Sequence, residues 1–409
     1  MHRHLTLIAL SLFLCHPAWA GESPTIEQLV AEGMALKDQG KFTEAEQRFE
    51  TALKRSPKSE IALIGLGRTY GAQGAYKKAE NAFLKAIKSH PRSLPAHRFL
   101  SLTYMGTRKM AKAEKFAKKA VKLAPKDWET VHGLAEIQIA RQRWDAAIKT
   151  EKKVLKLDPK NLHACTGLIR SYQSKGDYKR ASKYARKATQ IAPKLLEPRI
   201  KLAELYALQG KRKQGISTLK EAESLLNDDI RRIAILATSY VFLGATDNAA
   251  KLYSAYVKKN PKSAIGHAAL AEIRVKQKKF KAAEKHARLS KDLDPKSPMP
   301  YQILGVVAAL KKDYPNTEKY YTQAIEYAPK TLEVRLRYEF GMLLLEMKKP
   351  NKAISEFETI LKKFPDAEQI NRPLCQLYRQ VKQSGKRSKK VCLAACKQVS
   401  IAPEDCSLP

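Results

Sequence analysis

Long apolar runs and the short motifs of catalysis are both missing from most of this sequence. After the first twenty residues no segment approaches eighteen uninterrupted apolar residues, the length at which a run becomes a candidate membrane span. There is no glycine-rich phosphate loop, no His-Glu-x-x-His and no nucleophile elbow. The sequence therefore predicts a non-enzymatic protein with no cofactor, no metal site and no transmembrane helix in the mature chain.

Acidic residues are scarce relative to basic ones. The 409 residues include 40 Asp and Glu against 77 Lys and Arg, which gives a formal net charge of +37. This excess predicts attraction to polyanions or acidic proteins and says nothing about the fold. Because 44% of the residues are hydrophobic, the chain can still bury a large core.

The first twenty residues have the pattern of a signal peptide. Arg3 supplies a positive charge, residues 5–14 form a short apolar run, and a small-x-small site ends at Ala20. We therefore expect an exported protein, periplasmic or secreted, after cleavage following Ala20. A lipidated N-terminus at Cys15 is the alternative, which the bulky leucine before it disfavours. Export also argues against chromosomal nucleic acid as a partner.

The strongest pattern is a period of 34 residues. It is marked by recurring prolines, with Asn227 at the one missed position: Pro57, Pro91, Pro125, Pro159, Pro193, Pro261, Pro295 and Pro329. Within one unit, Leu66 and Tyr70 are a helical turn apart, as are Ala79 and Phe83, which predicts two amphipathic helices. Self-similarity at this spacing predicts a stacked repeat array.

The unit resembles a tetratricopeptide repeat. The resemblance rests on these residues of one unit, numbered 7, 8, 11, 20, 24, 27 and 32 within the repeat: Leu66, Gly67, Tyr70, Ala79, Phe83, Ala86 and Pro91. Ten units follow the pattern over residues 26–367, so the resemblance implies an all-α, right-handed α-solenoid of about ten helix hairpins. The sixth unit departs from it with Gly215 and no terminal proline. The match specifies the fold and leaves the function open.

The repeats contain one cysteine, Cys165, which we expect to be buried as an ordinary packing residue. Four more cluster after the repeats: Cys375, Cys392, Cys396 and Cys406. In an oxidising compartment such a cluster predicts two disulfides, with a zinc site as the rival interpretation. The resemblance makes residues 368–409 a divergent eleventh repeat that caps the stack. It implies a Cys375–Cys392 bridge with Cys396–Cys406, and the pairing Cys375–Cys396 with Cys392–Cys406 stays open.

The resemblance also implies a concave groove lined by positions 2, 5, 9, 12 and 13 of each first helix. Positions 12 and 13 give a mostly apolar stripe that would suit a helix or an extended peptide. The alternative is that these side chains pack between neighbouring repeats. The candidate groove residues are Met105, Ile139, Leu208, Val241, Phe242, Val275 and Leu310. The family's carboxylate clamp, lysine at position 5 with asparagine at position 9, is absent.

Basic residues recur on the second helices of repeats 2 to 5. Because residues 34 apart lie on adjacent repeats and residues three or four apart share a helix face, they predict an outward-facing convex ridge. We call it the basic ridge: Lys85, Lys115, Lys118, Lys119, Lys122, Lys149, Lys152, Lys153, Lys156, Lys183, Arg186 and Lys187. Lysine favours loose Coulombic attraction over bidentate recognition. The alternative is a solvated face.

Two functions follow from these features. The first is an exported scaffold that binds other proteins in the cell envelope and assembles or stabilises an export, pilus or surface-polymer apparatus. The second is a binder of anionic envelope polymers, polysaccharide or phosphorylated, through the basic ridge. The repeat histidines His97, His132, His163 and His267 are spaced singly and have no ligand partners within sequence reach.

Overall fold

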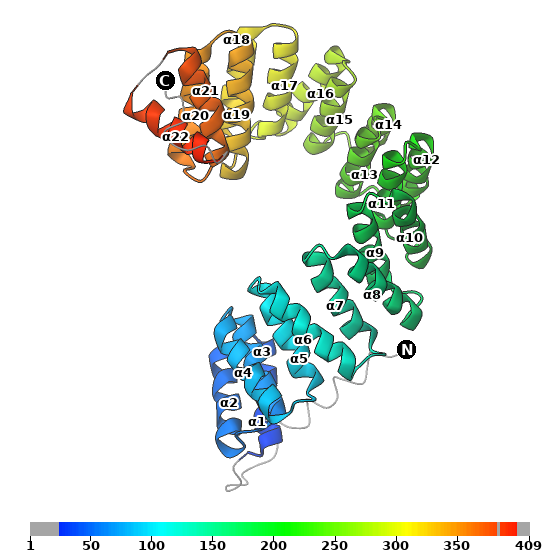
Figure 1. Ribbon diagram of the computed structural model, residues 1–409. Helices are drawn as coiled ribbons and strands as arrows, with labels where there is room; N and C mark the ends of the chain where they lie inside the picture. The colour runs from blue at the N-terminus through cyan, green and yellow to red at the C-terminus, as the bar shows by residue number, and fades with distance from the viewer. Residues whose placement is uncertain (1–23, 383–384, 399–409) are drawn as a thin grey trace, which may run out of the picture. The chain divides into compact units, whose positions relative to one another are not determined.

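The computed structural model describes residues 24–382 and 385–398, and over these ranges the chain consists of helices and turns without a β-strand (Figure 1). It divides into two compact units, Met1–Pro193 and Lys194–Pro409. The predicted signal peptide, residues 1–20, lies outside the described residues, as does Cys406. None of the described helices combines the length and apolar character needed to cross a bilayer.

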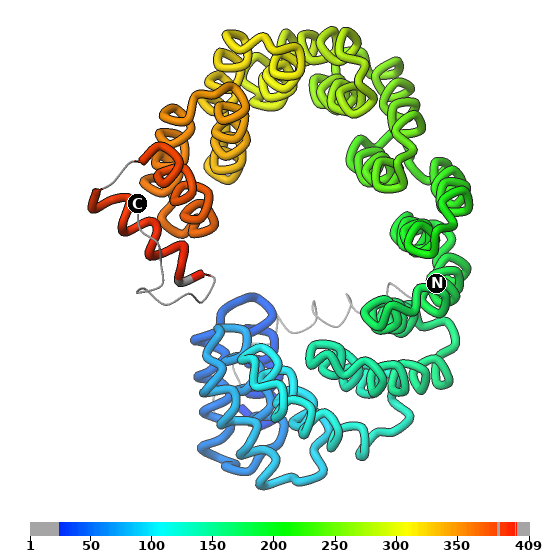
Figure 2. Tube along the Cα trace, turned by 45° about the horizontal axis from the view of Figure 1, so that its top comes forward, coloured from blue at the N-terminus to red at the C-terminus, as the bar shows by residue number. Residues whose placement is uncertain are grey.

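The first unit is built from five helix hairpins that follow one another along the chain (Figure 2). They are α1 (Ile26–Asp38) with α2 (Phe42–Arg55), α3 (Glu60–Ala72) with α4 (Tyr76–Ser89), α5 (Leu94–Gly106) with α6 (Met110–Leu123), α7 (Trp128–Ala140) with α8 (Trp144–Leu157), and α9 (Leu162–Ser174) with α10 (Tyr178–Ile191). First helices also pack on the next first helix, α1 on α3 and α7 on α9.

The second unit holds five more hairpins and the cap. These are α11 (Glu197–Leu208) with α12 (Arg212–Ala222), α13 (Ile230–Phe242) with α14 (Thr246–Lys259), α15 (Ala264–Lys276) with α16 (Phe280–Leu293), α17 (Pro298–Leu310) with α18 (Tyr314–Glu326), α19 (Lys330–Glu346) with α20 (Pro350–Lys363), and α21 (Asn371–Gln380) with α22 (Lys386–Gln398). The predicted α-solenoid of about ten hairpins is confirmed.

In repeats 1, 2 and 10 the two helices of the hairpin approach closely where positions 8 and 24 of the repeat meet. Phe49, Phe83 and Phe357 are buried at position 24. A Cβ added at Gly67 would lie 2.5 Å from a ring carbon of Phe83, so glycine is required for this approach. Burying each ring contributes about 1.5–3 kcal/mol, which makes this contact a main source of stability within a repeat.

The turn between the helices of a hairpin needs left-handed backbone. Gly74 has φ +75° there, and glycine takes the equivalent place in several other repeats. Other repeats use a larger residue in the same conformation, such as Gln142 at φ 57° and Lys278 at φ 59°. Each of these stores about 1–2 kcal/mol of local strain, which the packing of the flanking helices outweighs.

Neighbouring repeats are joined by a recurring hydrogen bond from a first-helix tyrosine to a glutamate of the preceding second helix. Tyr70 donates to Glu46 at 2.7 Å and Tyr104 to Glu80 at 2.8 Å. Burial, reinforced by the hydrogen bond to Glu80, raises the pKa of Tyr104 to about 12. The phenol therefore stays protonated and keeps donating across the physiological range.

Two repeats depart from the regular geometry. In the sixth, α12 is short and passes into a 3₁₀ turn (Glu223–Leu225), followed by left-handed backbone at Asn227 and Asp228. A Cβ on Gly215 would lie 2.9 Å from the Ala203 carbonyl oxygen, which explains the loss of the usual alanine. In the tenth, the two-residue insertion extends α19 at its start, directly after Pro329.

The C-terminal hairpin carries the predicted bridge. Cys375 in α21 and Cys392 in α22 form a disulfide, with their Cα atoms 4.9 Å apart, and this confirms the pairing that the resemblance implied. Leu374 and Tyr378 of α21 are fully buried, and the Tyr378 hydroxyl donates to Glu358 of α20 at 2.6 Å. The hairpin thus covers the last repeat. The second expected bridge, Cys396–Cys406, involves a residue outside the described ranges.

Candidate functional site

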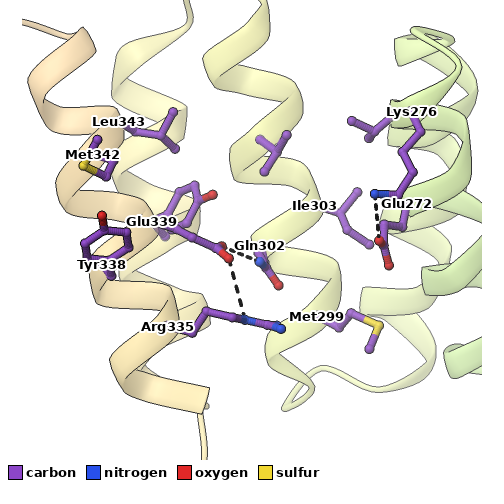
Figure 3. A pocket seen from close by; sticks show the side chains of 13 residues that line it. Glu272, Lys276, Met299, Gln302, Ile303, Arg335, Tyr338, Glu339, Met342 and Leu343 are labelled. Carbon is purple, nitrogen blue, oxygen red and sulfur yellow. Dashed lines mark hydrogen bonds and ion pairs between the residues drawn. The ribbon is translucent and has the colours of Figure 1, made fainter. Parts of the chain in front are cut away.

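A hollow of about 560 Å³ opens on the first helices of repeats 8, 9 and 10, all within the second unit (Figure 3). We call it the groove pocket. It is lined by one residue of α18 and by residues of α15, α17 and α19: Glu272, Val275, Lys276, Met299, Gln302, Ile303, Val306, Tyr321, Arg335, Tyr338, Glu339, Met342 and Leu343.

Helical spacing produces this lining. In α17, Met299, Gln302 and Val306 are spaced three and four residues apart and so share one face. In α19, Tyr338 and Met342 are one turn apart. Met299, Tyr338 and Met342 keep 37–41% of their surface exposed, whereas the floor of the pocket is buried. The pocket is therefore an open apolar surface and not a gap inside the core.

The rim of the groove pocket is polar and balanced in charge. Gln302 Nε2 donates to Glu339 Oε2 at 2.6 Å, and Arg335 Nε lies 3.6 Å from Glu339 Oε1 (Figure 3). On the opposite side, Lys276 Nζ lies 3.5 Å from Glu272 Oε1. Two cations face two carboxylates, although the whole chain carries +37. An apolar centre with a few placed polar groups is typical of a ligand pocket.

The predicted groove residues fall into three environments. Val275 lines the groove pocket. Leu208, Phe242 and Leu310 are 41%, 57% and 54% exposed at the ends of their helices. Val241 and Met105 are half-buried, and Ile139 is buried.

Sequence reasoning missed Met299, Tyr338 and Met342. They occupy positions 2, 5 and 9 of their helices, which belong to the same groove set, so the repeat register contains the signal that would predict them.

A smaller hollow lies on the first helices of repeats 1 to 3. It measures about 350 Å³ and includes Lys37, Arg68, Phe99 and Leu102. The Arg68 guanidinium carbon is 5.1 Å from the centroid of the Phe99 ring, within the range of a cation–π contact. This hollow of the first unit is amphipathic like the groove pocket of the second unit, but its surface is more basic.

The basic ridge lies on α4, α6, α8 and α10 of the first unit. Its side chains are exposed except Lys187, which is half-buried. A hollow of about 420 Å³, which we call the basic hollow, adjoins it between α6 and the α7–α8 turn: Ala111, Glu114, Lys115, Lys118, Lys119, Lys122, Arg141 and Arg143. Six cationic side chains there surround one carboxylate.

That carboxylate organises the basic hollow. Glu114 is 2% exposed, and Arg143 Nη1 and Lys118 Nζ lie 2.7 and 2.8 Å from its Oε1, while Arg141 pairs with Oε2. Burial alone would raise the pKa of Glu114, but the hydrogen bonds from Lys118 and Arg143 outweigh burial and lower it. Glu114 therefore stays ionised and holds the cations in place, and a net positive charge remains on the hollow.

The histidines are less isolated than their spacing in the sequence indicates. The rings of His132 and His163 have centroids 5.7 Å apart, and those of His267 and His286 are stacked at 5.3 Å. His267 Nδ1 and His286 Nδ1 are 3.1 Å apart. Each pair joins residues of two different helices, so the spacing of these histidines along the sequence does not indicate it.

The fold and this surface define a class: an α-solenoid of helix hairpins with an amphipathic face on its first helices. Models of the tetratricopeptide repeat match residues 30–91, 64–128, 164–195, 236–298 and 337–367. Together these segments cover more than half of the chain, which belongs to the tetratricopeptide repeat family. It is thus a repeat scaffold of the kind that binds other proteins or peptides.

Several solved structures are similar. A tetratricopeptide repeat protein from Parabacteroides merdae shares 16% identity over 61% of this chain and 98% of that one, with a TM-score of 0.44. A thermophilic repeat protein of Thermus thermophilus shares 24% over 45% of this chain and all of its own length, with a TM-score of 0.35. MamA shares 23% over 40% of this chain and 95% of its own, with a TM-score of 0.38. No curated protein sequence matches significantly.

Proposed function

We propose that this protein is an exported scaffold that holds segments of other proteins in the groove pocket. The observation that carries the proposal is the open apolar surface of Met299, Tyr338 and Met342 beside a charge-balanced rim. Exposed apolar side chains of this size gathered in one hollow mark an interaction surface more often than scattered ones do. Methionine side chains adapt to irregular partners.

The expected occupant is a peptide segment of mixed polarity. Two or three apolar side chains would fill the hollow between α17 and α19, and polar groups of the segment would reach the rim pairs around Glu339 and Glu272. A purely anionic ligand fits poorly, because the rim supplies as many carboxylates as cations. The groove pocket therefore differs from the basic ridge in charge and in the ligand that we expect it to bind.

The cell envelope is the proposed setting, where the scaffold would assemble or stabilise an export, pilus or surface-polymer apparatus. The signal-peptide pattern of residues 1–20 motivates it, and the Cys375–Cys392 disulfide supports it. Structural disulfides persist in oxidising compartments and are rare in reducing ones. Location of the tagged chain after cell fractionation tests this part independently of any partner.

Binding is tested with peptides selected on the intact protein from a displayed library. Met342→Asp places a carboxylate in the apolar centre, so dissociation constants should rise at least about tenfold, the equivalent of 1.4 kcal/mol. Ile61→Asp is the matched control, because Ile61 is 62% exposed in the first unit and lies outside the groove pocket. Equal affinity of all three proteins, each with native helicity, would rule out the groove pocket.

The predicted stripe has its own test. Leu208→Asp with Phe242→Asp alters two exposed side chains of the second unit that lie outside the groove pocket. Loss of peptide binding in this folded double variant would extend the binding surface beyond repeats 8 to 10. Unchanged binding would confine the surface to the groove pocket.

A second function, binding of anionic envelope polymers, is favoured by the basic hollow. Six cations around the single buried Glu114 leave a positive surface that neighbouring acids do not neutralise. Reversal of Lys119, Lys153 and Lys187 to Glu changes the local charge by about six and leaves the core unchanged. Polymer binding by the parent protein should weaken steeply with salt and disappear in this variant. Peptide binding in the groove pocket should not change.

A further inference from the structure

Repeat 4 carries a charged residue at the centre of its hairpin. Glu151 occupies position 24, where repeats 1, 2 and 10 bury Phe49, Phe83 and Phe357, and it is itself fully buried. An isolated buried carboxylate is strongly unfavourable unless it is paired or coordinates a metal. Gly167 of α9 makes room for it, because a Cβ there would lie 2.3 Å from Glu151 Oε1. The local sequence thus accommodates a carboxylate in place of a ring.

Three side chains from two helices converge at this place. His132 Nδ1 of α7 lies 2.9 and 3.2 Å from the two carboxylate oxygens of Glu151 of α8. Glu136 lies one turn beyond His132 on α7. One ligand atom from each of the three residues falls within 4.8 Å of the others.

Two further side chains border this group. Arg170 of α9 holds Glu136 with an N–O distance of 2.5 Å. The His163 ring of α9 is 5.7 Å, centroid to centroid, from that of His132.

We propose that His132, Glu136 and Glu151 bind a divalent transition-metal ion. A ligand bond of about 2.0–2.2 Å to nitrogen or oxygen is normal for zinc, and His132 and Glu151 already have the separation that two ligands of one ion require. Two carboxylates neutralise a dication. The imidazole favours zinc, copper, iron or nickel over magnesium and calcium, which prefer all-oxygen sites.

The position of the site gives the ion a role. His132 and Glu136 stand at positions 5 and 9 of α7, on the first-helix face, and their side chains are 19% and 36% exposed. Three protein ligands leave at least one coordination position open to that face. The ion would join α7 to α8 in repeat 4 and present an open position, to water or to a side chain of a bound partner.

The competing interpretation is that His132 and Glu151 form an ion pair that needs no metal. A change at Glu136 distinguishes the metal site from this ion pair. Glu136 is partly exposed and contacts Arg170, so Glu136→Gln leaves the buried pair intact. If the ion binds, this change removes a ligand. If only the pair exists, this change removes the contact with Arg170 and leaves Zn²⁺ binding as it is in the parent. Glu129→Gln on the same helix makes the same charge change at an exposed place outside the cluster and is the control.

The experiment titrates Zn²⁺ and, separately, Mg²⁺ into the full chain by calorimetry, with thermal unfolding recorded with and without the ion. The parent and Glu129→Gln should bind one Zn²⁺ at this site, ignore Mg²⁺, and unfold at higher temperature with Zn²⁺. Glu136→Gln should bind Zn²⁺ at least about tenfold more weakly and gain less in unfolding temperature than the parent at the same Zn²⁺ concentration. Failure of the parent to bind Zn²⁺, or equal binding by both variants, would overturn the proposal.

Discussion

Three glycines of repeat 2 should respond to alanine in three different ways. At Gly67 the added Cβ would lie 2.5 Å from the buried Phe83 ring, and overpacking of this kind costs about 1–3 kcal/mol. At Gly74 the space is open but φ is +75°, so alanine costs about 1–2 kcal/mol. Gly71, inside α3, has open space and ordinary helical backbone, and alanine there should stabilise by up to about 1 kcal/mol.

Native-state hydrogen exchange of α3 and α4 measures these effects locally, which matters because coupling in a solenoid falls off with distance. The Gly67→Ala and Gly74→Ala proteins should exchange faster in this hairpin, by about tenfold or more, and the Gly71→Ala protein somewhat more slowly. Amides of α7 and α8 are the internal control. Destabilisation of the same size by all three changes would refute the assignment of separate causes.

Two further predictions concern the second unit. Cys375→Ser with Cys392→Ser opens a loop with a sequence separation of 17, so the cap should lose about 3 kcal/mol of stability. Hydrogen exchange in α21 and α22 should then be about hundredfold faster. Unchanged exchange would contradict a stabilising bridge. Burial, together with the charges of His267, Lys285 and Arg274, lowers the pKa of His286. As the pH falls, His286 is protonated in the unfolded chain before it is protonated in the folded chain. The free energy of unfolding that is present above about pH 6.5 therefore decreases as the pH falls. Thermal unfolding between pH 8 and pH 5 should show this fall, and a His286→Asn protein should show less of it.

Local patterns in the sequence predicted the hairpins and the cap because they are set by contacts within one period. The spacing of Leu66, Tyr70, Ala79 and Phe83 defines both helices of a repeat, and the same register brings Cys375 to Cys392. The helix starts also follow a local rule, since residues such as Ser93 cap the first helix of the next repeat with a side-chain hydrogen bond.

The sites depend on contacts between particular side chains of different helices, which periodicity alone does not reveal. The groove pocket needs Met299 and Met342 on adjacent first helices at once, and only the packing of α17 beside α19 brings them to one hollow. The His132–Glu151 pair joins two helices and depends on a carboxylate at position 24, where several other repeats bury an aromatic ring. A search for residues that break the repeat consensus would have found Glu151.

The central claim is that partner segments bind in the groove pocket. Its most direct test is hydrogen exchange of the full chain, with and without a saturating selected peptide. Slowed exchange should be concentrated in α17 and α19, around Met299 and Met342, with α6 and α8 unchanged. Protection confined to α6 and α8, or absent from α17 and α19 at saturation, would contradict the account.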